Sequence, residues 1–223
     1  MHPPRLFVLG RQGAGKGTQC HRLAARLGIE HVSTGELFRV AVASGTRLGE
    51  KVRFYLDAGE LVPDDLVVDV VVRRLAVIDA YERGFVLDGF PRTVRQADML
   101  VSVLGTEVCD LAIELDVPTE VVLPRLASRR VCRGCGQSFS APNPTVERWR
   151  CEICDGVVAR RADDTEVAIR RRLALYDQDT APLLVLLHSK GLLVSVDGTG
   201  TPDQVHARLV AAAGGLTVPI AAS

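Results

Sequence analysis

The sequence lacks a net charge, a long hydrophobic run and, with three exceptions, lysine. Lys and Arg together number 27 and are balanced by 27 Asp and Glu, so no overall field attracts the chain to nucleic acid or to a membrane surface. No apolar run reaches the roughly 20 residues that a membrane-spanning helix needs. Residues 1–5 also lack the pattern of a secretory signal. We therefore expect a cytoplasmic protein with neither nucleic-acid nor membrane partners.

The scarcity of lysine makes arginine the main source of positive charge. The only lysines are Lys16, Lys51 and Lys190. Arginine presents a planar fork of donors that matches phosphate oxygens. Six cysteines are present, and in a reducing compartment they favour metal ligation or plain burial over a disulfide framework. A length of 223 residues suits one compact domain with small insertions.

Short apolar runs alternate with segments of helical periodicity along most of the chain. We expect strands at 6–9, 30–33, 85–87, 111–115 and 192–196. We expect helices at about 16–27, 48–58, 64–78, 93–104, 119–129, 166–188 and 202–213. This alternation predicts an α/β fold, in which crossover helices flank a parallel sheet.

Two segments depart from this alternation. Residues 131–155 are rich in Cys, Gly, Pro and Ser and have little periodicity, which indicates an inserted subdomain rather than a sheet element. The tail at 214–223 consists of small and apolar residues, and we expect it to be loose. No internal repeat is present.

A glycine-rich motif at 10–18 follows the first expected strand and precedes the first expected helix. It reads Gly-Arg-Gln-Gly-Ala-Gly-Lys-Gly-Thr, which matches the phosphate-binding pattern G-x-x-x-x-G-K in its required context. Glycines let successive backbone N–H groups face an anion, and the helix N-terminus and Lys16 add positive charge. The alternative, a glycine-rich turn with a solvated lysine, does not account for the flanking strand and helix.

The heptapeptide Leu-Asp-Gly-Phe-Pro-Arg-Thr at 87–93 lies at the carboxyl end of the expected strand 85–87. Open parallel sheets bind their ligands at this edge, so Asp88 is expected to face the phosphate loop. A carboxylate there suits the waters around Mg²⁺, and Arg92 suits a phosphate oxygen. Taken alone, the Asp-Gly and Phe-Pro pairs would predict only a turn.

Four cysteines occur as two C-x2-C pairs with 15 residues between them, at Cys132, Cys135, Cys151 and Cys154. This spacing is typical of a zinc site. Four thiolates close the coordination sphere, so the metal is expected to be structural. The spacing leaves an iron centre with four sulfur ligands open. A zinc ribbon that binds nucleic acid is the rival interpretation, and the balanced charge weighs against it.

From about residue 6 to residue 201, these motifs resemble those of the adenylate kinase family of nucleoside monophosphate kinases. The resemblance implies a P-loop NTPase-like, five-stranded parallel sheet with an inserted zinc-binding lid and a helical AMP-binding flap. It places the core at 1–32, 63–130 and 165–223, the flap at 33–62 and the lid at 131–164. The family usually has proline where this chain has Gln12, and we expect the change to affect loop rigidity rather than phosphate binding.

The resemblance also implies an activity, in which ATP and AMP are converted reversibly into two ADP with Mg²⁺. The sequence gives no sign of an oligomer interface, so a monomer is the default expectation. One alternative is a kinase for UMP, CMP or GMP. Another is a zinc-ribbon module that binds nucleic acid and uses ATP as a regulator. The residues implied in catalysis are Lys16, Asp88, Arg92, Arg129, Arg161 and Arg172.

The binding residues that the resemblance implies form two sets. Those for ATP are Gly13, Ala14, Gly15, Lys16, Gly17, Thr18, Arg125, Arg129, Ser138, Phe139 and Gly200. Those for AMP are Thr34, Arg39, Glu60, Leu61, Val62, Gly89, Phe90, Pro91, Arg92, Gln96, Arg161 and Arg172.

Several further expectations rest on residue type and spacing alone. Arg125 and Arg129 are four residues apart and are expected on one helical face, although Pro124 lies inside that helix. Ser33 or Thr34 would cap a helix, with Glu36 completing a capping box. Solvated surface positions are expected for Arg130, Arg160, Arg170 and Arg171. Burial is expected for Cys20 and Cys109, packing within the lid for Trp149, and the five histidines fit no ligand spacing.

Overall fold

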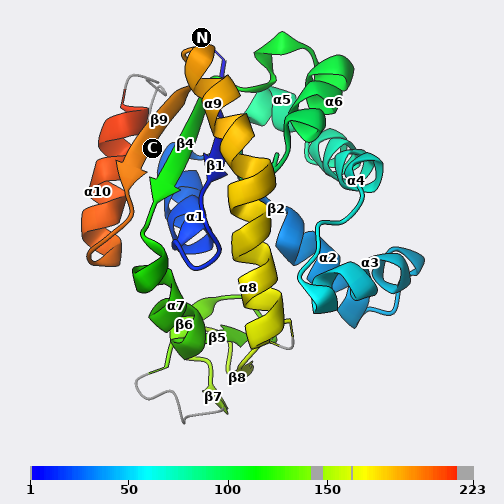
Figure 1. Ribbon diagram of the computed structural model, residues 1–223, viewed down its shortest axis with the longest axis vertical. Helices are drawn as coiled ribbons and strands as arrows, with labels where there is room; N and C mark the ends of the chain where they lie inside the picture. The colour runs from blue at the N-terminus through cyan, green and yellow to red at the C-terminus, as the bar shows by residue number, and fades with distance from the viewer. Residues whose placement is uncertain (1, 142–147, 162, 215–223) are drawn as a thin grey trace.

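A computed structural model describes residues 2–141, 148–161 and 163–214. Its main element is a five-stranded parallel sheet in the order β2-β3-β1-β4-β9 (Figure 1). The strands are β1 (Arg5–Leu9), β2 (Glu30–Ser33), β3 (Phe85–Asp88), β4 (Leu111–Asp116) and β9 (Leu193–Asp197). The predicted α/β fold is therefore confirmed, with each strand within one residue of its expected position.

Helices cover both faces of this sheet, which explains why the central strands β1 and β3 are buried almost throughout. Phe7 and Leu9 of β1 pack with α4 (Asp64–Val77), α6 (Val94–Leu104) and α9 (Ala181–Ser189) on one face. Leu6 and Val8 pack on the opposite face with α1 (Lys16–Leu27), α7 (Thr119–Ser128) and α10 (Pro202–Ala213). The alternation of β1 side chains thus divides the core into two apolar clusters.

Two helices that follow β2 pack closely against each other, α2 (Thr34–Ala43) and α3 (Arg47–Ala58). Sequence periodicity predicted α3, and the expected cap at Ser33 or Thr34 predicted the start of α2. Ser33 is the residue before α2, but its side chain makes no capping hydrogen bond, so the expected capping box is wrong. The short helices α5 (Ala80–Arg83) and η1 (Thr106–Val108) were also not predicted.

The helix expected at 166–188 consists of three consecutive segments. These are α8 (Glu166–Leu175), a π-helical turn η2 (Tyr176–Thr180) and α9. They form one long rod that crosses in front of the sheet in Figure 1. None of the described helices is long and apolar enough to cross a membrane.

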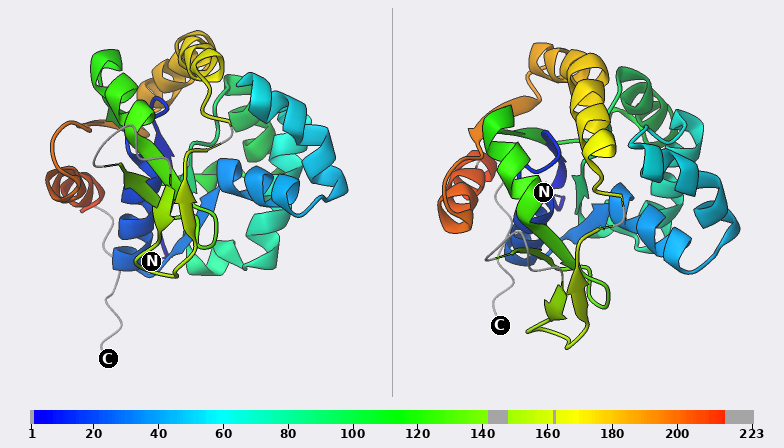
Figure 2. Two further views of the ribbon diagram at one scale, coloured as in Figure 1. Left: turned by 90° about the horizontal axis from the view of Figure 1, so that it is seen from below. Right: turned by 60° about the horizontal axis from the view of Figure 1, so that its bottom comes forward.

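A second, four-stranded antiparallel sheet occupies the insertion, in the order β6-β5-β8-β7. Its strands are β5 (Arg129–Cys132), β6 (Ser138–Ser140), β7 (Arg148–Arg150) and β8 (Val157–Ala159), and the right-hand view of Figure 2 brings them forward. The expectation that this segment holds no sheet element is wrong, because strands of three or four residues are too short to show a period of two. Residues 142–147, residue 162 and the expected loose tail after Gly214 lie outside the described residues.

The contact between α2 and α3 depends on a glycine. A Cβ atom at Gly49 would lie 2.1 Å from the Ala41 carbonyl oxygen. We predict that Gly49→Ala lowers the free energy of unfolding by about 2 kcal/mol through overpacking. The melting temperature should fall by about 6 °C in a thermal melt, while Ser44→Ala on the exposed end of α2 should leave it unchanged. An unchanged melting temperature for Gly49→Ala would contradict this packing.

Candidate active site

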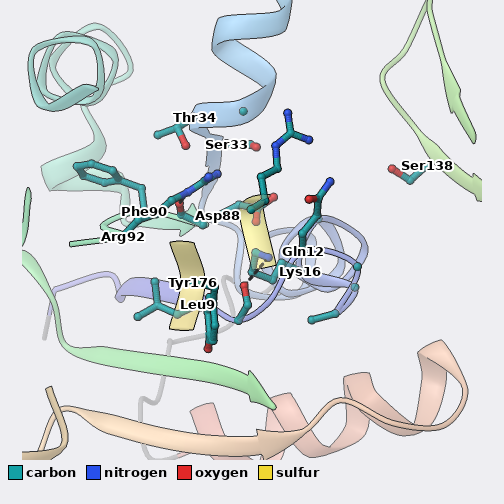
Figure 3. A pocket seen from close by; sticks show the side chains of 18 of the residues that line it. Leu9, Gln12, Lys16, Ser33, Thr34, Asp88, Phe90, Arg92, Ser138 and Tyr176 are labelled. Atoms are coloured by element: carbon teal, nitrogen blue, oxygen red, sulfur yellow. Dashed lines mark hydrogen bonds between the residues drawn. The ribbon is translucent and has the colours of Figure 1, made fainter. Parts of the chain in front are cut away.

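One cavity of about 560 Å³ lies at the carboxyl end of the strands. Every residue that the sequence analysis assigned to ATP or AMP lines it, and so do all six residues assigned to catalysis. Its walls come from the loop after β1, from the segments that follow β2 and β3, from the small sheet and from α8. Figure 3 shows Gln12, Lys16 and Asp88 near one another, with Ser138 on a separate segment. The structure therefore brings the predicted nucleotide residues together.

The phosphate loop ends directly at the start of α1, with Gly15 before Lys16. Gly13 and Gly15 have φ values of 86° and 99°, which favour glycine. The Lys16 ammonium donates hydrogen bonds to the carbonyl oxygens of Gly10 at 2.8 Å and Arg11 at 2.9 Å. Burial lowers the pKa of Lys16 to about 8. The ammonium group is therefore positioned inside the loop, but it loses its proton at a lower pH than an exposed lysine does.

Asp88 ends β3 beside this loop. Burial alone would raise its pKa, but a hydrogen bond from His31 and the charge of Lys16 outweigh burial and lower it. The His31 Nε2 atom lies 3.6 Å from Asp88 Oδ2. The sequence analysis did not single out His31, because its proximity to Asp88 arises only when β2 and β3 pair. Asp88 is thus an ionised carboxylate directed at the cavity.

Two aspartates organise the arginines of the cavity. The side chain of Asp164 is completely buried and accepts hydrogen bonds from Arg129 at 2.9 and 2.7 Å. Asp163 accepts from Arg161 at 3.1 Å and from Arg172 at 2.9 Å. Burial alone would raise the pKa of Asp163, but the hydrogen bond and charge of Arg161 hold it well below its usual range.

Asp163 and Asp164 are not among the site residues predicted from the sequence. The available signal was their position two and three residues after Arg161. The distance of Arg129 along the chain concealed its partner. Arg129 itself begins β5 instead of ending a helix, so the predicted shared helical face with Arg125 is wrong.

Two other arginines that line the cavity contact backbone carbonyls. Arg125 donates to the Gly198 oxygen at 3.2 Å and thereby joins α7 to the loop after β9. Arg92 donates through Nε to the Gly89 oxygen at 2.8 Å. Burial, together with the neighbouring charge of Arg172, lowers the pKa of Arg92. Within the described ranges, backbone carbonyls and not carboxylates therefore orient both guanidinium groups.

On the side of the cavity formed by α2, a buried glutamine is fixed by its neighbours. Gln96 accepts a hydrogen bond from the Arg92 backbone N–H at 2.7 Å and donates to Asp64 at 2.8 Å. Thr34 is also buried. Burial and the charge of Arg161 lower the pKa of Arg39 to about 10. This side of the cavity thus offers a fixed amide, a hydroxyl and a guanidinium.

Three of the four arginines expected at the solvated surface are exposed, as predicted. Arg160 donates from there to the Asp164 carbonyl oxygen at 2.9 Å, and Arg171 forms an ion pair with the Glu60 carboxylate at 2.7 Å. Arg170 pairs with Glu166 on the exposed face of α8. The prediction is wrong for Arg130, which is buried and donates to the carbonyl oxygens of Ala127 and Arg129. Sequence spacing could not show this burial, because it arises from packing.

The four cysteines of the insertion gather at one point outside the cavity. Their sulfur atoms all lie within 4.8 Å of one another, with Cys132 3.4 Å from Cys154 and Cys135 3.7 Å from Cys151. Four thiolates around zinc at about 2.3 Å stand about 3.8 Å apart. Backbone N–H groups of Cys135 and Gly134 lower the pKa of the Cys132 thiol. The cluster is therefore compatible with a tetrahedral metal site. Cys20 and Cys109 are buried elsewhere, as predicted.

Comparison with known proteins agrees with this geometry. A family model described as adenylate kinase matches residues 8–192. The chain belongs to the adenylate kinase family. The match includes the whole phosphate loop, the segment around Asp88 and the whole cysteine cluster.

Individual relatives extend the match over most of the chain. An adenylate kinase of Thermodesulfovibrio yellowstonii is 46% identical over 204 residues, which are 90% of this chain and 94% of the relative. An adenylate kinase of Moorella thermoacetica is 44% identical, covering 87% and 91%. One from Lachnospira eligens is 42% identical, covering 92% and 98%. The chain is thus similar to these adenylate kinases over nearly their full length.

The lowered pKa of Lys16 predicts a pH dependence. The ammonium is charged below about pH 8 and loses its proton above it. We therefore expect kcat/KM for ATP, which reports the free enzyme, to fall above about pH 8. Bound phosphate should stabilise the charge, so kcat should stay level to higher pH. Lys16→Arg should be less active but should show no such fall. If the wild-type kcat/KM for ATP stays constant from about pH 7.5 to about pH 9.5, Lys16 does not control this pH dependence.

Proposed function

We propose that the protein catalyses the reversible transfer of the γ-phosphoryl group of ATP to AMP, which gives two ADP. The observation that carries this proposal is the convergence of the phosphate loop, an ionised Asp88 and six arginines on one cavity. Membership of the adenylate kinase family supports the same activity. The structure holds no feature that favours UMP, CMP or GMP, or a nucleic acid, within the part of the chain that it describes.

On the ATP side, the phosphate loop would bind the triphosphate through its N–H groups and Lys16. Arg125 and the lid residues Ser138 and Phe139 would contact the base, the ribose or the phosphates, and Gly200 would contact the adenine through its main chain. The remaining ATP-binding positions are Gly13, Ala14, Gly15, Gly17, Thr18 and Arg129.

On the AMP side, Thr34 and Gln96 would contact the adenine, and Arg39 and Arg172 the phosphate. Residues Glu60, Leu61 and Val62 would line the base through their main chain. This fits the structure, because the Glu60 side chain is directed to Arg171. The segment of Gly89, Phe90, Pro91 and Arg92 would complete the site.

Phosphoryl transfer requires positioning and charge neutralisation more than covalent chemistry from the protein. Arg92, Arg129 and Arg161 would neutralise the charge of the transferring group, while the two nucleotides lie in line. Asp88 would hold Mg²⁺ through water, and its ionised state fits this role. When bound, Mg²⁺ would supply positive charge that neutralises the charge developing on the transferred group. Transfer would be direct, without a phosphorylated enzyme.

We further propose three working parts within a monomer in the cytoplasm. The core would comprise 1–32, 63–130 and 165–223, the flap 33–62 and the lid 131–164. Closure of the flap and lid would exclude water, which could otherwise accept the phosphoryl group. The placement of Ser138 and Phe139 in the cavity wall supports a lid that reaches ATP.

The cysteine cluster is proposed to hold one structural Zn²⁺. The sulfur distances fit four-coordinate zinc. Among the described residues around them, the small sheet has a core of Cys132, Cys151 and Val158, with Phe139 and Trp149 packed against it. So small a core cannot stabilise the segment alone, and a metal can supply the missing free energy.

Substrate choice and the site residues can be tested by steady-state kinetics. We expect ADP formation with AMP to exceed that with CMP, UMP or GMP clearly. Lys16→Met and Arg92→Ala should each lower kcat by roughly a hundredfold or more. Each substitution removes a positive charge of the protein that would stabilise the transferring phosphoryl group. Lys51→Met, on the exposed face of α3, should retain the wild-type rate. Near-normal rates for Lys16→Met or Arg92→Ala would refute the site assignment.

The metal can be tested separately from catalysis. Purified protein should contain one zinc per chain, and elemental analysis would distinguish zinc from iron. Cys132→Ser should lower the melting temperature by about 10 °C, because a ligand of the cluster is lost. The catalytic rate at about 25 °C should change less than twofold, since the cluster lies outside the cavity. Equal losses of rate and of stability would argue against a structural role.

A further inference from the structure

Gln12 connects the phosphate loop to the segment that leaves the small sheet. Its Nε2 atom lies 3.0 Å from Oδ1 of Asp164, a residue 152 positions along the chain. Gln12 also lines the cavity beside Lys16. The side chain therefore spans the two parts of the protein that must meet around the phosphates of ATP.

The partner of Gln12 is the carboxylate that holds Arg129. Asp164 is completely buried, and Arg129 donates to it through both Nε and a terminal nitrogen. Such a bidentate contact fixes the orientation of a guanidinium group. Arg172 lies 3.5 Å from the same carboxylate. Gln12 is thus a neutral donor to an anion that several arginines share.

The chemistry of the contact determines how the amide is oriented. An ionised carboxylate only accepts hydrogen bonds, so the Gln12 NH₂ group must face Asp164. Its Oε1 atom is then buried, with no hydrogen-bond partner among the described residues. A buried acceptor without a partner is unfavourable. The charge-assisted hydrogen bond to Asp164 offsets this cost. The NH₂ group is therefore the part of the Gln12 side chain that stabilises this arrangement.

We propose that Gln12 is a positioning residue for ATP, because its amide holds Asp164 and Arg129 over the phosphate loop before ATP binds. This inference rests on the proposed phosphoryl transfer at the same cavity. A site that is already arranged binds its ligand more tightly than one that is arranged only part of the time. Proline, the usual residue of the family at this position, has no donor and cannot make this contact.

The first test is Gln12→Met, which keeps the length of the side chain but removes the donor. Loss of one hydrogen bond to a charged group should raise KM for ATP about tenfold. KM for AMP should change less than twofold, because Gln12 lies on the phosphate loop. The matched control is Gln178→Met, an exposed glutamine of η2, which should change neither constant. An unchanged KM for ATP in Gln12→Met would overturn the proposal.

A double-mutant cycle then separates positioning from direct contact with ATP. In an Asp164→Ala background, Gln12→Met should raise KM for ATP by less than twofold further. If Gln12→Met still costs about tenfold there, Gln12 acts on ATP directly and the proposal is wrong. Arg129→Met serves as the background if Asp164→Ala fails to fold, and the same outcomes apply. Failure of the proposed function is distinct, because the wild-type protein would then form no ADP from ATP and AMP.

Discussion

The pairing of two buried aspartates with arginines is the interaction on which the site depends. Guanidinium groups crowded into one cavity repel each other, and burial together with neighbouring arginines lowers the pKa of both Arg92 and Arg129. Asp163 and Asp164 supply opposite charge at hydrogen-bond distance. Without them, the arginines would gain by turning to solvent. The aspartates thus keep a cationic cavity compact while it is empty of phosphate.

The central strands β1, β3 and β4 were predictable because they are largely buried and read as apolar runs. The edge strands β2 and β9 carry more polar or exposed residues. The phosphate loop and Asp88 were predictable for a related reason, since each lies at the carboxyl end of a buried strand. The small sheet was not, because its strands are shorter than the window in which periodicity appears. For α2 only the start was predicted, from the cap at Ser33 or Thr34, and the π-helical turn within 166–188 has no distinct sequence pattern.

Contacts across long stretches of chain were the least predictable part of the site. Gln12 and Asp164, or His31 and Asp88, become neighbours only through the fold. The sequence showed which residue types were available, and the resemblance indicated which of them line the cavity. It did not show which partner each arginine uses, so buried Arg130 was assigned to solvent, and the contact of exposed Arg171 with Glu60 was not predicted. Partner choice is a property of packing and not of spacing.

The rod formed by α8, η2 and α9 contacts each part of the proposed mechanism. Arg172 near its start binds Asp163 and the Leu56 carbonyl oxygen at the end of α3. In its middle, Thr180 donates to the Arg92 carbonyl oxygen, and Leu183 and Leu187 anchor it in the core. The rod is thus anchored in the core near one end and binds Asp163 and Leu56 near the other. Because Arg172 contacts both Asp163 and Leu56, a tilt of this rod would displace the proposed lid exit and the proposed flap together.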